Sequence, residues 1–151
     1  MNTYLLLWNP DKWDWNSLNE DSDSCQRRGF FDERWSCGVT KKIVPEDRVF
    51  LIKIGRGQTG IMAAGFAKST FFKDAHFSKP SKTAIYNENR FDVLLPPHKG
   101  ESLLSGEALP EFTWSPRAGG ITIPPKIAGI TRGALGKTPC SDRSRAPTDH
   151  K

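Results

Sequence analysis

The sequence predicts an α+β domain, a small mixed barrel or half-barrel of about five to six strands with a few short helices. Two continuous apolar runs, residues 48–54 and 61–67, flank a glycine-rich hexapeptide. Further short apolar runs are separated by Pro, Gly and Asn, which is typical of strands joined by turns. At 151 residues the chain is long enough for one domain with a real core.

The two apolar runs are predicted to form the hairpin that organises the fold. Gly55-Arg-Gly-Gln-Thr-Gly60 supplies the glycines that a reversing chain needs at positive φ. Neither run alternates as a sheet with one wet face would, so we expect both strands to be buried on both sides. Gly65, inside the second run, indicates that another backbone approaches closely there.

The remaining elements are expected around this hairpin. Strands are expected at residues 4–8, 83–86 and 90–95, a loop or short helix at 16–24, and short helices at 102–109 and 126–135. Residues 111–114 are apolar enough to return to the core, and residues 118–125 are expected to form a loop. We divide the chain into one domain at residues 1–135 and a disordered basic tail, rich in Pro and Ser, at residues 136–151.

The composition and the cysteine pattern predict the cellular compartment of the protein and the state of its thiols. No apolar run approaches the length of a membrane span, and the N-terminus lacks a signal-peptide pattern, so we expect a cytoplasmic protein. Cys25, Cys37 and Cys140 are an odd number without metal-ligand spacing. We expect three free thiols in a reducing compartment, and neither a metal nor a cofactor.

The net charge of +5 is unevenly distributed. Residues 117–151 hold seven Lys or Arg and two Asp, so the whole excess lies at the end of the chain. Residues 27–82 are also basic, with 12 cations against five anions. A basic middle segment is compatible with a polyanionic partner, although it is also what a solvated surface looks like.

The sequence contains few signs of an enzyme. His76, His98 and His150 are scattered, and no HxH, HExxH, CxxC or GxSxG pattern occurs. Residues 55–60 have the G-x-G-x-x-G spacing, but an apolar strand follows where a nucleotide-binding loop needs a helix. We expect no catalytic activity, and a reactive Cys37 stays open as the enzymatic alternative.

Aromatic residues point instead to a binding site. The chain has five tryptophans, which are Trp8, Trp13, Trp15, Trp35 and Trp114. They could all be packing residues, or two or three of them could wall a pocket for a flat ring. Trp13 and Trp15 are too close to share a helix face, so one of them is expected at a surface or groove. Trp35, expected in a polar loop beside Ser36 and Cys37, is the best candidate wall for a flipped base.

Five segments together resemble the EVE domain of the PUA-like superfamily. They are Tyr4-Leu-Leu-Leu-Trp-Asn-Pro10, Arg34-Trp-Ser-Cys-Gly38, Asp47-Arg-Val-Phe-Leu-Ile52, Gly60-Ile-Met-Ala-Ala-Gly65 and Asp74-Ala-His-Phe77. The chain looks most like the version found at the N-terminus of bacterial HNH-type restriction endonucleases, over about residues 3–130. The resemblance implies a PUA-like pseudo-barrel of mostly antiparallel strands.

EVE domains are similar to YTH domains, which read methylated adenine in RNA. The resemblance therefore implies a pocket for a modified base, plausible ligands being 5-methyl- or 5-hydroxymethylcytosine flipped from DNA. It also implies a recognition module of a restriction or defence system. The related chains continue into a nuclease domain, whereas these 151 residues contain no His-Asn-His arrangement, so the resemblance assigns no cutting activity and leaves a separately encoded nuclease open as a partner.

Position by position, the resemblance implies the following roles. Trp35 is a wall of the aromatic cage, with Ser36 and Cys37 at the base edge. Trp8 and Asn9 lie at the pocket mouth or side. The expected base-binding set also includes His76, Phe77 and Trp114.

The chain departs from the family pattern at several of these positions. Phe77 stands where relatives have Trp, and Arg117 and Gly119 replace two polar positions after Trp114. The modification that is read therefore cannot be transferred from the family.

The basic residues are expected to hold phosphates. The expected set is Arg27, Arg28, Lys41, Lys42, Arg56, Lys68, Lys73 and Arg117. Such contacts position a nucleic acid without specifying its sequence.

Two other functions stay open beside a reader of modified DNA. The first is an RNA-binding module that takes a modified or single-stranded base, since contacts to the 2′-hydroxyl leave no sequence motif. The second is a small-molecule site or an enzyme that uses Cys37. No membrane partner is expected.

Overall fold

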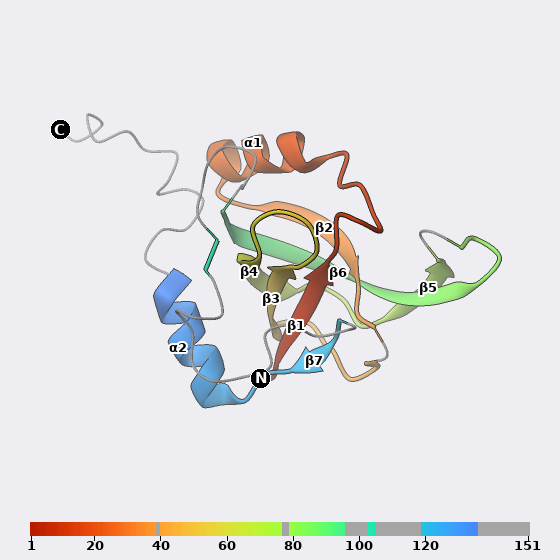
Figure 1. Cartoon of the computed structure of the whole chain (residues 1–151). Helices are drawn as coiled ribbons and strands as arrows, with labels where there is room; N and C mark the ends of the chain where they lie inside the picture. The colour runs from red at the N-terminus through yellow and green to blue at the C-terminus, as the bar shows by residue number, and fades with distance from the viewer. Residues whose placement is uncertain (39, 77–78, 96–102, 105–118, 136–151) are drawn as a thin grey trace.

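The structure is a mixed α+β domain with seven strands and two helices in the part that it describes (Figure 1). The computed structural model describes residues 1–38, 40–76, 79–95, 103–104 and 119–135. The strands are β1 Thr3–Trp8, β2 Phe31–Ser36, β3 Arg48–Lys53, β4 Gly60–Ala67, β5 Phe72–Ala75, β6 Thr83–Leu94 and β7 Ile121–Thr122. The helices are α1 Leu18–Arg28 and α2 Pro125–Leu135. The predicted α+β class is confirmed.

All seven strands belong to one sheet. Its order is β2-β6-β4-β3-β1-β7, and β5 pairs with the first part of β6. Every pairing is antiparallel except that of β1 with β3. The indole N–H of Trp35 on β2 donates to the carbonyl of Leu7 on β1, at 2.8 Å. Since these strands are four places apart in the sheet order, the sheet curls into a small barrel-like shape.

The central hairpin has the structure that its sequence predicts. β3 and β4 pair from Arg48–Phe66 to Lys53–Gly60, and nearly all their residues are buried. Gly55, Gly57 and Gly60 adopt φ values of +82°, +80° and +144°, which side chains rarely tolerate.

The close backbone approach expected at Gly65 is confirmed. A Cβ atom at this position would lie 1.9 Å from the carbonyl oxygen of Arg90 on β6. The pairing of β4 with β6 shifts register between Ala64 and Gly65. The glycine therefore lets the two backbones meet where the ladder is irregular.

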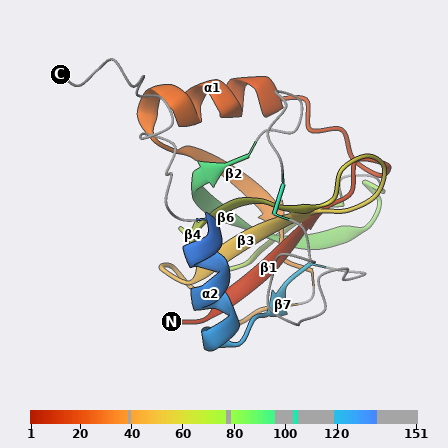
Figure 2. The ribbon, with the colours of Figure 1, turned by 60° about the vertical axis from the view of Figure 1, so that its left-hand side comes forward.

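The helices cover different parts of the sheet. α1 packs against β2 and β6, and it lies across β2 in Figure 2. It carries acidic residues in its first turn and arginines in its last, and Gly29 ends it at φ +86°. α2 begins at Pro125, a residue suited to a first helical position. Arg132 of α2 pairs with Asp92 of β6 at 3.2 Å.

Several predicted elements need correction. The two strands expected at 83–86 and 90–95 belong to one long strand, β6, which ends at Leu94 and whose middle pairs with β2; Asn87 and Asn89 are buried within it and bond to each other. Residues 31–36, expected to be a polar loop around Trp35, form β2, in which polar and apolar residues share one strand.

Two further predictions concern the end of the chain. The expected loop at 118–125 contains β7, and Leu104, in the expected helix 102–109, instead bridges to Ile61. The last helix is confirmed, whereas residues 111–114 and the tail from residue 136 lie outside the described residues.

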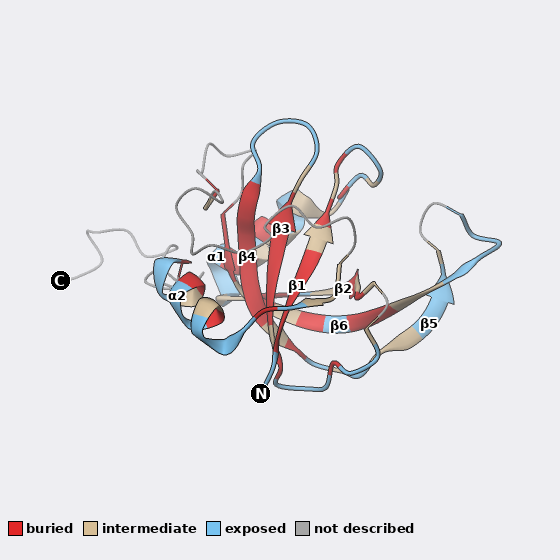
Figure 3. Cartoon of the chain, turned by 60° about the horizontal axis from the view of Figure 1, so that its bottom comes forward, coloured by how far each residue is buried: buried red, intermediate tan, exposed pale blue. Residues whose placement is uncertain are grey.

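Burial is concentrated in β1, β3 and β4, the red strands at the centre of Figure 3. Among the cysteines, Cys37 is a buried free thiol, but Cys25 takes part in a disulfide. The expectation of free thiols is therefore wrong for Cys25, and the odd cysteine count gave no sign of a pairing. Neither described helix is long and apolar enough to cross a membrane.

Candidate functional site

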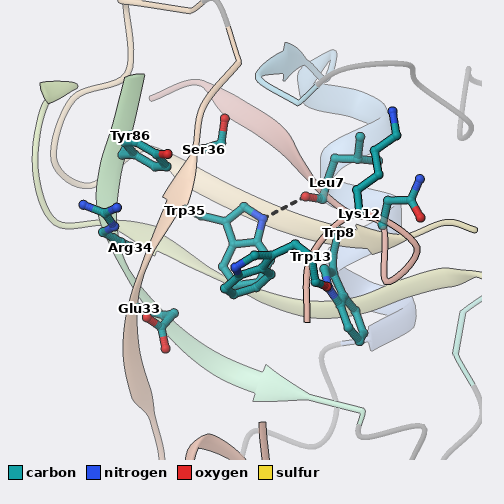
Figure 4. Close-up of a pocket in the computed structure, with 10 residues that line it drawn as sticks. Leu7, Trp8, Lys12, Trp13, Glu33, Arg34, Trp35, Ser36 and Tyr86 are labelled. Carbon is teal, nitrogen blue, oxygen red and sulfur yellow. Dashed lines mark hydrogen bonds between the residues drawn. The ribbon is translucent and has the colours of Figure 1, made fainter. Parts of the chain in front are cut away.

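A cavity of about 160 Å³ opens where the ends of β1 and β2 separate (Figure 4). Its lining from β1 and the following turn is Leu7, Trp8, Asn9, Lys12 and Trp13. Its lining from β2 and β6 is Glu33, Arg34, Trp35, Ser36 and Tyr86. The aromatic pocket, as we call this cavity, thus joins segments that are distant in the sequence.

The aromatic pocket is built on a cluster of four tryptophans. Trp35 lies edge-on to Trp13, with ring centroids 5.0 Å apart and an interplanar angle of 88°. Trp15 contacts Trp35 at 4.9 Å and Trp8 at 5.4 Å, behind the pocket wall. Such edge-to-face contacts are the favoured geometry of aromatic rings, so the cluster is a rigid wall. Trp13 is half-buried, whereas the other three are at most 8% exposed.

Three indole N–H groups are satisfied inside the protein. Trp35 donates to the carbonyl of Leu7, the dashed bond in Figure 4, and Trp8 donates to the carbonyl of Trp13 at 3.0 Å. Trp15 donates to Asp21 Oδ2 at 2.8 Å. Of these rings, Trp8 and Trp35 line the cavity, and they can offer a ligand apolar contact but no indole hydrogen-bond donor.

Polar side chains surround the aromatic wall. Lys12 is exposed and forms no salt bridge with any described residue. Arg34 stacks over the ring of Tyr86, 4.2 Å from its centroid, and pairs with Asp74. The Ser36 hydroxyl accepts a hydrogen bond from the Gly38 backbone at 3.3 Å. Of the two cations on the lining, Lys12 is thus the one with no anionic partner in the described part.

Glu33 is the acidic member of the lining. The Ser17 hydroxyl lies 3.3 Å from Glu33 Oε2 and 3.0 Å from Asp21 Oδ2, so the two carboxyls share its single proton as acceptors. Burial, the neighbouring Asp21 carboxyl and the charge of Glu88 raise the pKa of Glu33 to about 7, against a smaller lowering by Ser17. Near pH 7 the ionised and neutral forms of Glu33 are therefore present in similar amounts, and this side chain lines the aromatic pocket.

The structure brings together four of the predicted base-binding residues. Trp8, Asn9, Trp35 and Ser36 all line the aromatic pocket. Their contact with a base stays a prediction.

Cys37 and His76 lie elsewhere. Cys37 follows the last residue of β2, is fully buried and does not line the pocket. Burial raises the pKa of its thiol to about 11, which keeps the unreactive thiol form at neutral pH. His76 lies beyond β5, and its Nδ1 accepts a hydrogen bond from the backbone of Lys79. Phe77 and Trp114 lie outside the described residues.

The seven described residues of the predicted phosphate-binding set lie in five separate segments, and four of these residues have partners within the protein. Arg56 pairs with Asp11 at 3.1 Å, and Lys68 pairs with Asp32 at 3.1 Å. Two others lie over aromatic rings: Arg28 over Phe30 and Lys41 over Phe71. Arg27, Lys42 and Lys73 are exposed, and Arg117 lies outside the described residues.

Sequence reasoning missed part of the lining. Lys12, Glu33, Arg34 and Tyr86 were not expected in the site. Glu33 could have been predicted, because it lies two residues before Trp35 and alternate residues of a strand point to the same face of the sheet. Tyr86 could not have been predicted, since only the pairing of β2 with β6 places it opposite Ser36.

No group of three or more His, Cys, Asp or Glu among the described residues is placed to hold a metal ion. Comparisons with protein-family models, with curated proteins and with solved structures find no match to the chain. The site must therefore be interpreted from its own geometry.

Proposed function

We propose that the chain is a non-catalytic reader of modified nucleic-acid bases and that the base enters the aromatic pocket. The leading candidate is a modified cytosine flipped from DNA. The observation that carries the proposal is the cavity of about 160 Å³ beside Trp13 and Trp35. An apolar cavity of about 150 Å³ accepts a benzene ring, so this one has room for a single flat ring.

The lining supports a ligand site rather than a packing defect. A gap in a core is lined by apolar side chains, whereas this cavity also meets Lys12, Glu33 and Asn9. Ligand sites typically combine aromatic walls with a few polar groups that fix the orientation. Stacking on an aromatic wall contributes about 1–3 kcal/mol per base and tolerates any base, so the polar groups would supply the selectivity.

The position of Lys12 supports a nucleotide over an isolated ring. Its exposed ammonium group lies at the cavity with no anionic partner in the described part. A phosphate next to the flipped nucleoside would supply that partner. The resemblance to EVE domains points to the same class of ligand, and the overall charge of +5 favours a polyanion.

RNA remains the second candidate, since an aromatic pocket for a flat ring serves either nucleic acid. The geometry does not favour thiol chemistry, because Cys37 is buried and lies outside the pocket. Competition between matched DNA and RNA oligonucleotides separates the first two functions.

The test is fluorescence anisotropy with one duplex that carries cytosine, 5-methylcytosine, 5-hydroxymethylcytosine, 3-methylcytosine or N6-methyladenine at a single position. We expect one modified duplex to bind at least about tenfold more tightly than the plain one, a difference of about 1.4 kcal/mol. Trp13→Ala is expected to remove this preference while leaving the weak, salt-sensitive binding to plain DNA. Equal affinity for all duplexes would overturn the proposal.

A further inference from the structure

Glu33 lacks the counter-ion that a charged wall residue normally has. It forms no salt bridge with any described residue, and the nearest charged group on α1 is another carboxyl, Asp21. Glu88, on the neighbouring strand β6, adds a further negative charge. Each charged group that acts on Glu33 from α1 and β6 therefore has the same sign as its own carboxylate.

The two cations of the lining do not compensate Glu33. Arg34 is the next residue of β2 and its guanidinium pairs with Asp74. Lys12 and Glu33 lie on opposite sides of the Trp35 ring in Figure 4. The aromatic pocket is therefore polarised, with an acid at one side and, at the other, a cation that no described residue pairs.

From this polarity we propose that the ring bound in the aromatic pocket carries a positive charge and that Glu33 is its counter-ion. The inference rests on the proposed function and narrows its ligand to bases alkylated on a ring nitrogen, such as 3-methylcytosine. A positively charged ring gains an electrostatic attraction to the faces of tryptophans in addition to the stacking that a neutral ring also has. It also gives Glu33 an oppositely charged partner, where the described residues offer only a hydrogen bond to Asp21 and one to Ser17.

The same polarity explains why the ligand is a nucleotide rather than a simple organic cation. A nucleotide of an alkylated base carries positive charge on the ring and negative charge on the phosphate. The ring would face Glu33 and the phosphate would face Lys12. A simple ammonium ion would gain the first contact but would be repelled by Lys12.

Proton linkage gives the inference a distinctive signature. The pKa of Glu33 is raised to about 7, so the carboxylate forms as the pH rises toward that value. The affinity for a cationic ring should therefore rise with pH below about 7, approaching tenfold per pH unit if only the ionised form binds. The second ionisation of the nucleotide phosphate, at a pKa of about 6, affects both rings equally, so the ratio of the two affinities isolates Glu33.

The experiment uses the full chain and two isomeric nucleotides. 3-Methylcytidine 5′-monophosphate has a cationic ring at neutral pH, and 5-methylcytidine 5′-monophosphate has a neutral ring of the same composition. Calorimetric titrations at about pH 5.5, 6.5 and 7.5 are expected to show a preference for the 3-methyl isomer that grows at least about tenfold over this range. Glu33→Gln keeps the shape of the side chain and should abolish the pH dependence and most of the preference. Glu20→Gln, an equal charge change at an exposed position of α1, should leave both intact.

The outcomes separate this inference from the proposed function. Tighter binding of the 5-methyl isomer, or a preference that is flat with pH, overturns the inference and leaves the base reader standing. A preference unaltered in Glu33→Gln also overturns it. Failure of both nucleotides to bind, together with equal affinity for all duplexes, overturns the base reader and the inference with it.

Discussion

The β3–β4 hairpin and the aromatic pocket each contain a partly buried charged side chain, but the two charges have different surroundings in the described part of the chain. Lys53, at the end of β3, is 6% exposed, and its ammonium group donates to the carbonyls of Arg56 and Gln58 at 2.5 and 2.6 Å. Glu33, in the pocket, faces two other carboxyls instead. A buried charge without a partner costs stability, so a fold retains one where it serves another purpose. The difference indicates that the hairpin is built for stability and the aromatic pocket for binding.

The largest expected effect comes from Trp35, a buried ring of the aromatic pocket that also ties β2 to β1. Trp35→Ala removes a 5%-exposed ring that contacts Trp13 and Trp15 and bonds to β1. We expect the free energy of unfolding to fall by about 4 kcal/mol, measured by urea denaturation. Trp35→Phe keeps an aromatic ring and should cost less. A loss below about 1 kcal/mol for Trp35→Ala would show that this ring is not a structural member of the wall.

The hairpin should be nearly as sensitive at Gly65. Gly65→Ala places a methyl group against the carbonyl of Arg90, and the backbone of β6 must move to admit it. We expect a loss of about 3 kcal/mol in the free energy of unfolding, with unchanged nucleotide affinity in the folded fraction. Gly129→Ala, at a helical position with open space around it, is the matched control and should be neutral or stabilising. Equal effects of the two substitutions would contradict the close approach of β4 and β6.

Substitution of Trp13 should show the reverse pattern, with a clear loss of affinity and little loss of stability. Its ring is half-buried and lines the cavity, so Trp13→Ala should cost little stability and about 1–3 kcal/mol of affinity for a modified base. Anisotropy titration and urea denaturation of the same variant measure the two quantities. If stability falls and affinity does not, Trp13 is a packing residue and the comparison between the two regions fails.

The smallest effect concerns pH and stability. The pKa of Glu33 is higher in the folded chain than the ordinary value of 4.5, so folding takes up a proton between about pH 4.5 and about pH 7. Stability from this group is therefore present at low pH and lost as the pH rises through that window, by roughly 1 kcal/mol after solvent screening. Glu33→Gln should flatten this part of the stability profile. A decline of the same size in Glu33→Gln would assign it to another group.

The sequence predicts the hairpin region well because its information is local. A β-branched apolar run, a glycine-rich turn and a second apolar run are consecutive, so strand, turn and burial follow from neighbouring residues. The same is true of the last helix, which begins at Pro125. By contrast, residues 86–91 in the middle of β6 pair with β2, a partner that the local sequence does not reveal.

The aromatic pocket was predicted only in part because its lining is assembled by tertiary structure. Composition and the Trp-Ser-Cys segment indicated Trp35, and residues 4–10 indicated Trp8 and Asn9. The approach of β1 to β2 and the pairing of β2 with β6 add Glu33, Arg34 and Tyr86. Cys37 was expected at the base edge, but it comes after the last residue of β2 and lies in the interior.

The most direct test of the account is tryptophan fluorescence during titration with a modified nucleotide. Trp8, Trp13 and Trp35 line the pocket and Trp15 packs behind them, so a bound ring must alter their emission. The account predicts saturable quenching in the wild type by at least one modified nucleotide, and a much smaller change in Trp13→Ala. Unchanged emission while an oligonucleotide binds would contradict it, because binding would then involve the charged surface alone.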